Sequence, residues 1–287
     1  MAKRCSKCIL SESFPNIIFD SNGVCNYCHS WDKKWKYYDF KSAENELKKL
    51  FARVKNKKNK KYDCLVPFSG GRDSSYVLYL CKEKYNLNIL AVTFNNLFMS
   101  DYAFKNISKI VEKMGVDHVF VTYNPELLKN FYSIMVKTCG EFCSICTAGI
   151  NHAILQYQSL FSIPMVITGI SSMVDENSPF EVNSTHPKYV RRVLQEQGFR
   201  TDEINTFVID RHNEWSTEKK IKAKLYDKDY LEINLPDYVE WNNNEIQQKL
   251  SSVLAWETPD EEQDHIDCKF APIKTFLKNK QIPNFIY

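Results

Sequence analysis

No stretch of this 287-residue sequence approaches the roughly 18 consecutive apolar residues of a membrane-spanning helix, so we expect no membrane span and no membrane partner. The start, MAKRCSKC, has no apolar segment of the kind found in secretory signals, and we therefore expect a cytoplasmic protein in a reducing compartment. The chain also lacks internal repeats and low-complexity tracts. Its formal net charge of +3 is nearly balanced and identifies no partner by itself.

Cysteine, by contrast, is frequent, with ten residues in the chain. In a reducing compartment these cysteines are better explained as metal ligands or reactive thiols than as disulfides. The hydrophobic share of 44% and the charged share of 25% are ordinary for a soluble globular protein. The length permits a sizeable core and predicts one main domain with appendages.

Strand and helix patterns alternate from residue 61 onward. Strands are expected over 64–68, 89–94, 118–122 and 165–168, and helices over 74–85, 102–114, 125–137 and 147–160. This order predicts an α/β fold with a doubly wound parallel sheet, right-handed crossovers and ligands at the carboxyl ends of the strands. After about residue 179 helices rich in aromatics dominate, which predicts a mostly helical C-terminal region.

The junction between the first strand and the first helix reads SGGRDSS, from Ser69 to Ser75. Two glycines let the backbone turn with positive φ, and the first helical N–H groups favour negative charge, so the loop predicts a phosphate site. It lacks the Gly-Lys-Ser/Thr ending of the Walker loop, and γ-phosphate transfer of that kind is not expected. SGGxDS instead resembles the PP-loop of ATP pyrophosphatases, which transfer AMP to a substrate oxygen. A Gly-Gly turn without a ligand is the alternative.

Two CxxC pairs lie near the start of the chain and have the spacing of a tetrahedral zinc site. The four residues are Cys5, Cys8, Cys25 and Cys28. A turn over 20–23 is expected to close a hairpin between the pairs. Four thiolates leave no open coordination position, so we expect a structural zinc ion that supplies folding energy to a small module. His29 is an alternative for one of the ligands.

A second cysteine group comprises Cys139, Cys143 and Cys146, with Cys268 far down the chain. The 139–146 spacing is that of a radical SAM cluster, but that interpretation requires a barrel whose first loop carries the motif. A CxxC pair plus one distant cysteine is similar to the iron–sulfur site of PP-loop sulfur transferases, which implies a [4Fe-4S] cluster on Cys143, Cys146 and Cys268. A second zinc site, a redox dithiol and merely buried cysteines remain open.

The N-terminal part of the chain resembles the N-acetyl sugar amidotransferase family, which is a family of PP-loop enzymes of surface-polysaccharide and nonulosonic-acid assembly. The matching segments are FPNIIFD at 14–20, GVC at 23–25, YDC at 62–64, SGGRDS at 69–74, GVD at 115–117, NP at 124–125, residues 140–150 and IP at 163–164. The resemblance covers about residues 4 to 170. It implies replacement of the acetamido oxygen of a nucleotide-linked or free sugar by nitrogen, with ammonia delivered by a glutaminase partner.

The same resemblance implies ATP and Mg²⁺ as cofactors and assigns roles to the loop. The residues expected to bind the phosphates are Ser69, Gly70, Gly71, Ser74 and Ser75, with Asp73 holding Mg²⁺ and Arg72 adding positive charge. The adenine and ribose are expected near Thr93, Phe94 and Asn95, at the end of the second strand. Gly169 and Asp175, on a second loop, are expected to face the phosphates or the metal.

The attacking nucleophile separates two functional hypotheses. If it is ammonia, the enzyme is a sugar amidotransferase and needs no reactive thiol. If it is sulfide or a persulfide, the enzyme thiolates a tRNA base or a small molecule, and Cys143 and Cys146 become catalytic. A zinc-knuckle adaptor whose loop only binds nucleotide is a third interpretation.

The expected domains are a zinc-binding knuckle (1–30), a helical spacer with a Lys-rich linker (31–60), an ATP-binding domain (61–178) and a mostly helical substrate-side region (179–287). Within the last region, Trp241 and Trp256 are expected to pack in the interior. The helix over 187–197 carries Arg191 and Arg192, which could contact an anionic substrate or face solvent. His265 is expected to be structural.

Overall fold

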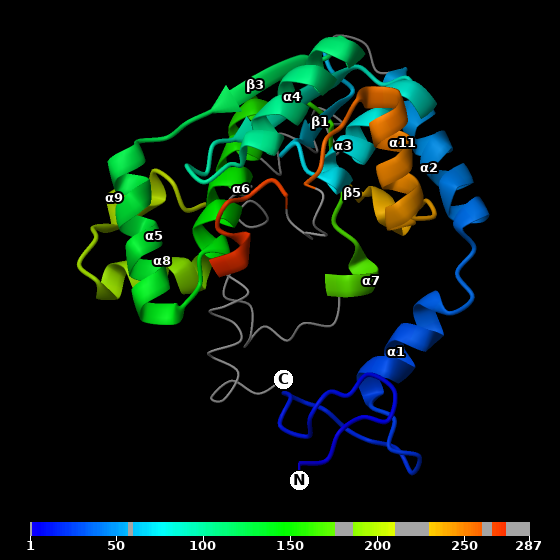
Figure 1. The fold of residues 1–287 in the computed structure, drawn as a ribbon, viewed down its shortest axis with the longest axis vertical. Helices are drawn as coiled ribbons and strands as arrows, with labels where there is room; N and C mark the ends of the chain where they lie inside the picture. Colours follow the sequence, from blue (N-terminus) through cyan, green and yellow to red (C-terminus); the bar gives the residue numbers. More distant parts are fainter. Residues whose placement is uncertain (1, 57–59, 176–185, 210–229, 260–265, 274–287) are drawn as a thin grey trace, which may run out of the picture.

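The computed structural model describes residues 2–56, 60–175, 186–209, 230–259 and 266–273 (Figure 1). Its centre is a five-stranded sheet in which every pairing is parallel, with the strand order β3-β2-β1-β4-β5. The strands are β1 Cys64–Pro67, β2 Ile89–Phe94, β3 Asp117–Val121, β4 Met165–Thr168 and β5 Leu231–Asn234. The predicted α/β fold with a doubly wound parallel sheet is confirmed.

Helices cover both faces of this sheet. The helices are α1 Asn26–Trp35, α2 Phe40–Lys55, α3 Arg72–Tyr79, α4 Asp101–Met114, α5 Pro125–Cys139, α6 Cys143–Leu160, α7 Ser172–Asp175, α8 Pro187–Glu196, α9 Thr201–Asn205 and α11 Asn243–Leu254. A π-helical turn, Leu80–Lys84, continues α3, and a 3₁₀ turn, Leu235–Asp237, follows β5.

The two faces of the sheet are sealed by separate apolar clusters, because successive strand residues point to opposite sides. Val66 of β1 packs in one cluster together with residues of α2, α3, α4 and α11. Leu65 packs in the other, against Ala153 and Ile154 of α6. Burial on both faces explains why β1, β2 and β4 are nearly continuous apolar runs.

Local signals set the ends of the principal helices. Ser100 caps α4 by accepting a hydrogen bond from the N–H of Ala103, and Gly115 ends that helix in the left-handed conformation. Asn124 caps α5 in the same way, ahead of Pro125 at the first helical position. The expected helices over 102–114 and 125–137 are therefore found to within two residues at each end.

The last part of the chain returns to the sheet. β5 pairs with β4, and α11 packs against α3 and α4 (Figure 1). The sheet therefore draws on residues beyond the range 61–178 that was expected for the α/β domain. The sequence did not signal β5, because only one of its four residues is fully buried and an edge strand needs little apolar surface.

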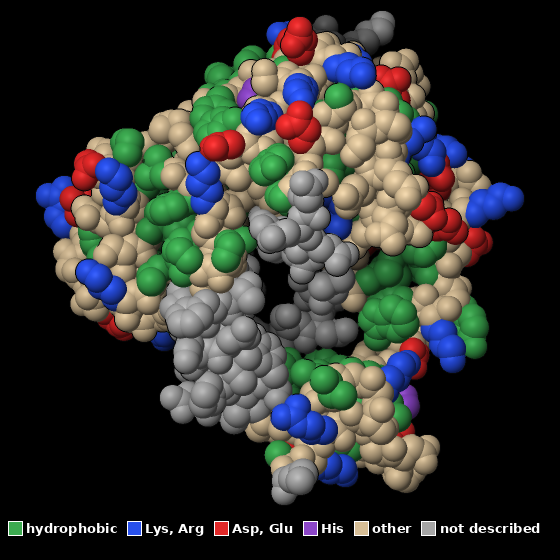
Figure 2. Space-filling model, viewed as in Figure 1, with side chains coloured by type: hydrophobic (Ala, Val, Ile, Leu, Met, Phe, Trp, Pro, Cys, Tyr) green, Lys and Arg blue, Asp and Glu red, His purple; other side chains and the backbone are tan. Residues whose placement is uncertain are grey.

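Two further units flank the sheet. Helices α5, α8 and α9 form a helical lobe with the start of α6, held by an aromatic cluster that includes Phe131 and Phe207. The cysteine knuckle lies at the opposite end of α1 from the sheet, and the molecule is hollowed between the knuckle and the α/β body (Figure 2). Within the described residues, no helix is long and apolar enough to cross a membrane.

Candidate functional site

The loop from Ser69 to Ser75 leaves the carboxyl end of β1 at the point where the sheet changes direction. β1 pairs with β2 on one side and with β4 on the other. The chain proceeds from β1 to β2 and β3, and then returns to β4 on the other side of β1. Connections therefore diverge above β1, and the crevice at such a switch point is where open α/β sheets bind ligands.

Gly70 occupies a position that only glycine fits. Its φ is +79°, and a Cβ added there would lie 2.6 Å from the carbonyl oxygen of Ala103. The Gly70 carbonyl accepts hydrogen bonds from the indole N–H of Trp256 (3.0 Å) and the side-chain amide of Asn106 (3.2 Å). Both donors are buried. The sharp turn that the two glycines predicted is therefore fixed in place from α4 and from the C-terminal segment.

The loop and the start of α3 present donors to the crevice. Gly71 is the N-cap residue of α3 and has no side chain with which to cap the helix, so the first-turn N–H groups are available to an anion. The hydroxyls of Ser69 and Ser74 lie 3.1 Å apart, and the Ser69 hydroxyl accepts from the Gly71 N–H at 3.3 Å. The loop amides of Ser69 and Gly71 donate to these two hydroxyls, and the uncapped first turn of α3 lies beside them, where phosphate binding was predicted.

Asp73 and Arg72 face each other in the first turn of α3. Arg72 donates from Nε and from a terminal nitrogen to the two carboxylate oxygens, at 3.0 and 3.2 Å. Asp73 Oδ1 also accepts from the indole N–H of Trp241 at 3.2 Å. Gly169, on the loop after β4, lies against Asp73, because a Cβ added at Gly169 would be 3.2 Å from that of Asp73. The second glycine loop therefore meets the first, and the predicted contact of Gly169 with the phosphates or the metal stays a prediction.

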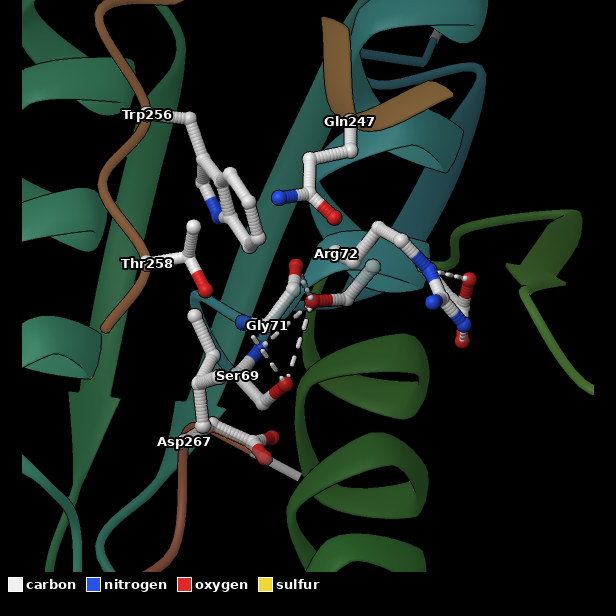
Figure 3. A pocket seen from close by; sticks show the side chains of 10 residues that line it. Ser69, Gly71, Arg72, Gln247, Trp256, Thr258 and Asp267 are labelled. Carbon is white, nitrogen blue, oxygen red and sulfur yellow. Dashed lines mark hydrogen bonds and ion pairs between the residues drawn. The ribbon is translucent and has the colours of Figure 1, made fainter. Parts of the chain in front are cut away.

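A pocket opens over this loop, with about 470 Å³ of empty space that includes open solvent (Figure 3). The lining residues are Ser69, Gly71, Arg72, Asp73, Ser74, Gln247, Trp256, Thr258, Ile266 and Asp267. Half of them come from the C-terminal part of the chain. The pocket therefore combines the predicted phosphate loop with a wall that the sequence did not indicate.

Other residues predicted for nucleotide binding do not line this pocket. Ser75 is fully buried in α3, and its hydroxyl has no hydrogen-bond partner among the described residues. Thr93 is buried, where its hydroxyl donates to the Phe68 carbonyl and lies 2.8 Å from His118 Nε2. Thr93 thus holds the residue that precedes the loop. The predicted contacts of these side chains with nucleotide stay predictions.

The remaining nucleotide-site predictions concern strand and loop ends. Phe94 is buried against Gly149 of α6, where an added Cβ would lie 2.3 Å from the phenyl ring. Asn95 accepts from the Leu97 N–H at 3.0 Å and so shapes the turn after β2. Asp175 is the last residue of α7, but its side chain lies outside the described part of the chain, as does His265.

Cys146 and Cys268 flank the side-chain amide of Asn96, although they are far apart in sequence. The amide nitrogen lies 3.7 Å from the Cys146 sulfur and 3.9 Å from that of Cys268. Cys143 precedes Cys146 by three residues and is the first residue of α6, so the two thiols share one helix face. The structure therefore brings Cys146 and Cys268 to one amide, and a shared ligand set that includes Cys143 stays a prediction.

The electrostatics of this thiol group reflect its burial. Burial, together with the charges of Cys143 and Cys268, raises the pKa of Cys146 to about 12, although the hydrogen bond from Asn96 lowers it. Burial likewise raises the pKa of Cys268. Cys139, the remaining cysteine of this segment, contacts the Tyr189 hydroxyl of α8 at 3.1 Å.

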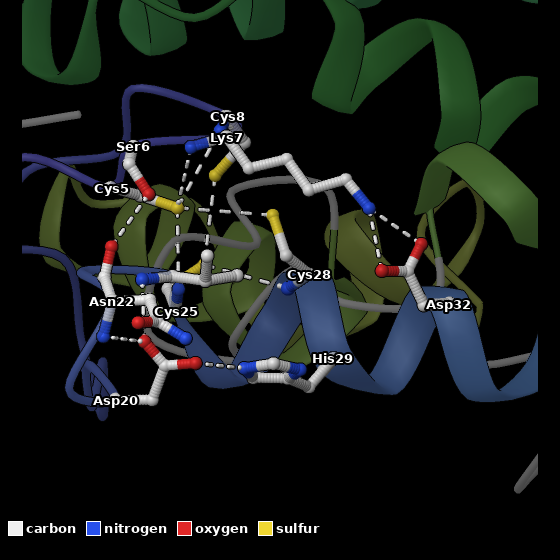
Figure 4. A network of polar contacts seen from close by, with 11 residues as sticks. Cys5, Ser6, Lys7, Cys8, Asp20, Asn22, Cys25, Cys28, His29 and Asp32 are labelled. Carbon is white, nitrogen blue, oxygen red and sulfur yellow. Dashed lines mark hydrogen bonds and ion pairs between the residues drawn. The ribbon is translucent and has the colours of Figure 1, made fainter.

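The N-terminal knuckle brings four sulfurs into one group (Figure 4). The ligand atoms of Cys5, Cys8, Cys25 and Cys28 all lie within 4.8 Å of one another, and in the part of the chain that the structure describes no other set of three or more cysteine, histidine or acidic ligands is this close. The sulfur–sulfur distances are 3.9 Å for Cys5 and Cys28 and 3.6 Å for Cys8 and Cys25. This arrangement suits a single tetrahedral ion.

Backbone N–H groups already surround one of these thiols. Burial alone would raise the pKa of Cys5, but hydrogen bonds from the N–H groups of Cys8, Lys7 and Cys25 lower it to about 6. His29, the alternative ligand, is instead paired with Asp20 at 2.8 Å, in the predicted turn (Figure 4). Helix α1, which leaves the knuckle, contacts α7 through Trp31, whose indole N–H donates to the Met173 carbonyl at 3.2 Å.

Several residues of the site were not predicted from the sequence. Trp241 and Trp256 were expected only to pack, yet each donates its indole N–H to the loop or its carboxylate. Asn96 and Asp267 belong to no sequence motif. Their role is seen only in the fold, where the loop after β2 packs against segment 266–273. The adjacency of Asp267 to Cys268 was the one available signal.

Fold and site together define a parallel α/β protein with a glycine loop at its switch point, two half-buried cysteines beside Asn96 and a four-cysteine knuckle. No protein-family model matches the chain. A protein of Methanocaldococcus jannaschii, named only as uncharacterised, is 26% identical over 167 residues. That alignment covers 58% of this chain, and the chain spans 58% of the length of that relative.

Several solved structures are similar to this chain, with low scores. An NH3-dependent NAD synthetase from Campylobacter jejuni has a TM-score of 0.37 and 12% identity, with 79% of this chain and 100% of that chain covered. A U34-tRNA thiolase from Methanococcus maripaludis with its [4Fe-4S] cluster has a TM-score of 0.37 and 16% identity, with 99% of this chain and 83% of that chain covered. An NMN synthetase from Francisella tularensis has a TM-score of 0.36 and 13% identity, with 78% of this chain and 100% of that chain covered. Chemistry is therefore argued from this chain's own residues.

Proposed function

We propose that the protein is an ATP-dependent enzyme of the PP-loop type, which activates an oxygen atom of its substrate as an AMP ester. The observation that carries this proposal is the SGGRDSS loop at the switch point, where the uncapped start of α3 and the residues Ser69 and Ser74 border one pocket. The missing Walker lysine argues against γ-phosphate transfer. An α-phosphate that is open to attack, with pyrophosphate held by the loop, fits this geometry.

The proposed chemistry has two steps. The substrate oxygen attacks the α-phosphorus, the bond to the β-phosphate oxygen breaks, and pyrophosphate leaves with its charge stabilised by the N–H groups of the loop. A nucleophile then attacks the activated carbon, the carbon–oxygen bond breaks, and AMP leaves. Adenylation is needed because an amide oxygen is a poor leaving group, whereas AMP is a good one.

The finer assignment that we propose is amidation of an N-acetyl sugar. Its support is the N-terminal resemblance, in which the knuckle motif, the spacer helix and the loop follow in one order over about residues 4 to 170. In this proposal the substrate is a nucleotide-linked or free sugar, ammonia comes from a glutaminase partner, and the knuckle holds a structural zinc ion. On the face shown in Figure 2, the described basic and acidic side chains are interspersed, which suits a small acceptor better than a long nucleic acid.

Sulfur transfer is the second candidate, and one structural observation favours it. Cys146 and Cys268 flank Asn96, Cys143 precedes Cys146 by three residues on α6, and Cys268 directly follows Asp267, which lines the pocket at the loop. Three thiolates with an open fourth position fit an iron–sulfur cluster, which would supply a site for a sulfur atom. Amidation does not require this arrangement. In the sulfur-transfer case the acceptor is a small molecule or a tRNA base.

The two candidates are separated by the fate of a Cys143→Ser variant. Purified protein, ATP and Mg²⁺ are incubated with an N-acetyl sugar or with tRNA as acceptor, and with an ammonium salt or sulfide as donor, and products are identified by mass. Cys139→Ser is the matched control, because this cysteine lies in the same segment but contacts Tyr189. Nitrogen incorporation that survives in both variants supports amidation. Sulfur incorporation that only Cys143→Ser abolishes supports sulfur transfer and overturns amidation.

A further inference from the structure

Asp267 places a carboxylate directly against the phosphate loop. A Cβ added at Gly71 would lie 3.1 Å from Asp267 Oδ2 and 3.3 Å from the Ser69 hydroxyl. The three residues line the same pocket, and Figure 3 shows the carboxylate beneath the loop, on the side of Ser69. The carboxylate therefore borders the space in which the loop would hold phosphate.

The segment that carries Asp267 is fixed from both sides. The backbone carbonyl of Asp267 accepts a hydrogen bond from the Ser100 N–H at 3.1 Å, and the Lys269 N–H donates to the Phe98 carbonyl at 2.8 Å. The Phe270 ring stacks on that of Phe142 at 3.9 Å, immediately before α6 begins. Asp267 is thus held in place by the loop after β2 and by the start of α6, rather than by its neighbours in sequence alone.

The charges around the pocket do not suit a bare polyphosphate. The lining contains two carboxylates, Asp73 and Asp267, and one guanidinium, that of Arg72. Arg72 is engaged with both oxygens of Asp73. Within the described ranges, no hydrogen bond or ion pair reaches the Asp267 carboxylate. A phosphate at the loop would therefore meet an uncompensated negative charge, unless a cation lies between them.

We propose that Asp267 receives the divalent cation that accompanies the phosphates of the nucleotide. Mg²⁺ is bound in such sites by one or two carboxylates together with phosphate oxygens, so this carboxylate turns from a repulsive group into a ligand when the nucleotide arrives as its magnesium complex. This inference rests on the proposed function, because it assumes that the loop binds a nucleotide. It adds a cation ligand to the one predicted from the loop, Asp73.

The test is the cation dependence of nucleotide binding, measured by calorimetry with a non-hydrolysable ATP analogue. Wild type, Asp267→Asn and Asp202→Asn are each titrated with excess Mg²⁺ and with a chelator. Asp202 is the matched control because it is an exposed acid on α9, paired with Arg200. With Mg²⁺, Asp267→Asn is expected to bind roughly tenfold or more weakly than wild type, and with the chelator as well or better. Asp202→Asn should match wild type in both conditions.

Several results would overturn this role. One is that Asp267→Asn binds the analogue in Mg²⁺ as tightly as wild type does. Another is that it binds more tightly than wild type both with Mg²⁺ and with the chelator, because the carboxylate would then only repel the phosphates. Asp267→Glu keeps the negative charge, so in Mg²⁺ it should bind the analogue more tightly than Asp267→Asn does. If Asp267→Glu and Asp267→Asn lose the same affinity in Mg²⁺, the carboxylate is not a cation ligand. If wild type binds no analogue in either condition, the proposed function itself fails.

Discussion

At the scale of single residues, Gly70 and Gly115 form a natural comparison. Both have positive φ, +79° and +55°, so both lose a favourable backbone when substituted. Only Gly70 also lacks room, because its added Cβ would meet the Ala103 carbonyl at 2.6 Å, whereas nothing lies within 4 Å at Gly115. The loop therefore combines conformational strain with tight packing, which is typical of a site that holds a ligand close to the backbone.

We expect Gly70→Ala to lower the free energy of unfolding by about 1–3 kcal/mol more than Gly115→Ala does, because only the former must displace backbone of α4. Urea titrations of the two variants and wild type measure this difference. Gly70→Ala should also lose nucleotide binding, while Gly115→Ala retains it. Equal destabilisation by the two substitutions would contradict the packing described for the loop.

His118 provides a pH-dependent test of the same region. Burial lowers its pKa from the ordinary value of 6.5, while its Nε2 contacts the Thr93 hydroxyl that holds Phe68. The unfolded chain therefore takes up a proton at a higher pH than the folded chain, so stability falls as the pH drops through the ordinary value toward about 5. In His118→Gln this component should disappear. Parallel stability profiles between about pH 8 and 5 would contradict it.

At the scale of elements, the packing of α6 on β2 depends on Gly149. Gly→Ala within a helix ordinarily stabilises by about 0.5–1 kcal/mol. Here the added Cβ would lie 2.3 Å from the Phe94 ring, so we expect Gly149→Ala to lower the free energy of unfolding by about 1–3 kcal/mol instead. Thermal and urea unfolding measure the sign. A stabilised variant would show that α6 does not approach the sheet so closely.

The knuckle should depend on its metal, because its apolar cluster consists largely of the cysteines themselves. Metal analysis of purified protein should find zinc, which Cys25→Ser loses and Cys139→Ser retains. After chelation, limited proteolysis should cleave within residues 2–35, while the circular dichroism of the α/β unit persists. Protein that is free of zinc but resists proteolysis in this range would contradict the assignment.

At the scale of the whole molecule, site residues could be predicted where they lie close together in the sequence, and not where folding brings distant segments together. The SGGRDSS loop and the four-cysteine knuckle were found because their residues are close in sequence and their spacing carries the chemistry. Trp256, Asn106 and Asp267 were not found, because they reach the loop only through the folding of distant segments. Thr93 was placed near the correct strand end, but packing turned its hydroxyl toward Phe68.

The same long-range folding gives the molecule its proposed function. Segment 266–273 places Asp267 at the pocket over the loop and Cys268 beside Asn96, which also contacts Cys146, so the proposed activation site and these cysteines are one residue apart along the chain. Neither the loop nor the cysteine motif alone predicts this adjacency. Either proposed nucleophile would therefore act next to the activated substrate.

The most direct test follows the acceptor oxygen through the reaction. Acceptor labelled with oxygen-18 in the acetamido group is incubated with the protein, ATP, Mg²⁺ and an ammonium salt, and the nucleotide products are analysed by mass. Formation of an AMP ester predicts AMP that carries the label, together with pyrophosphate. Formation of ADP and phosphate, or AMP without the label, would contradict activation of the substrate oxygen by adenylation.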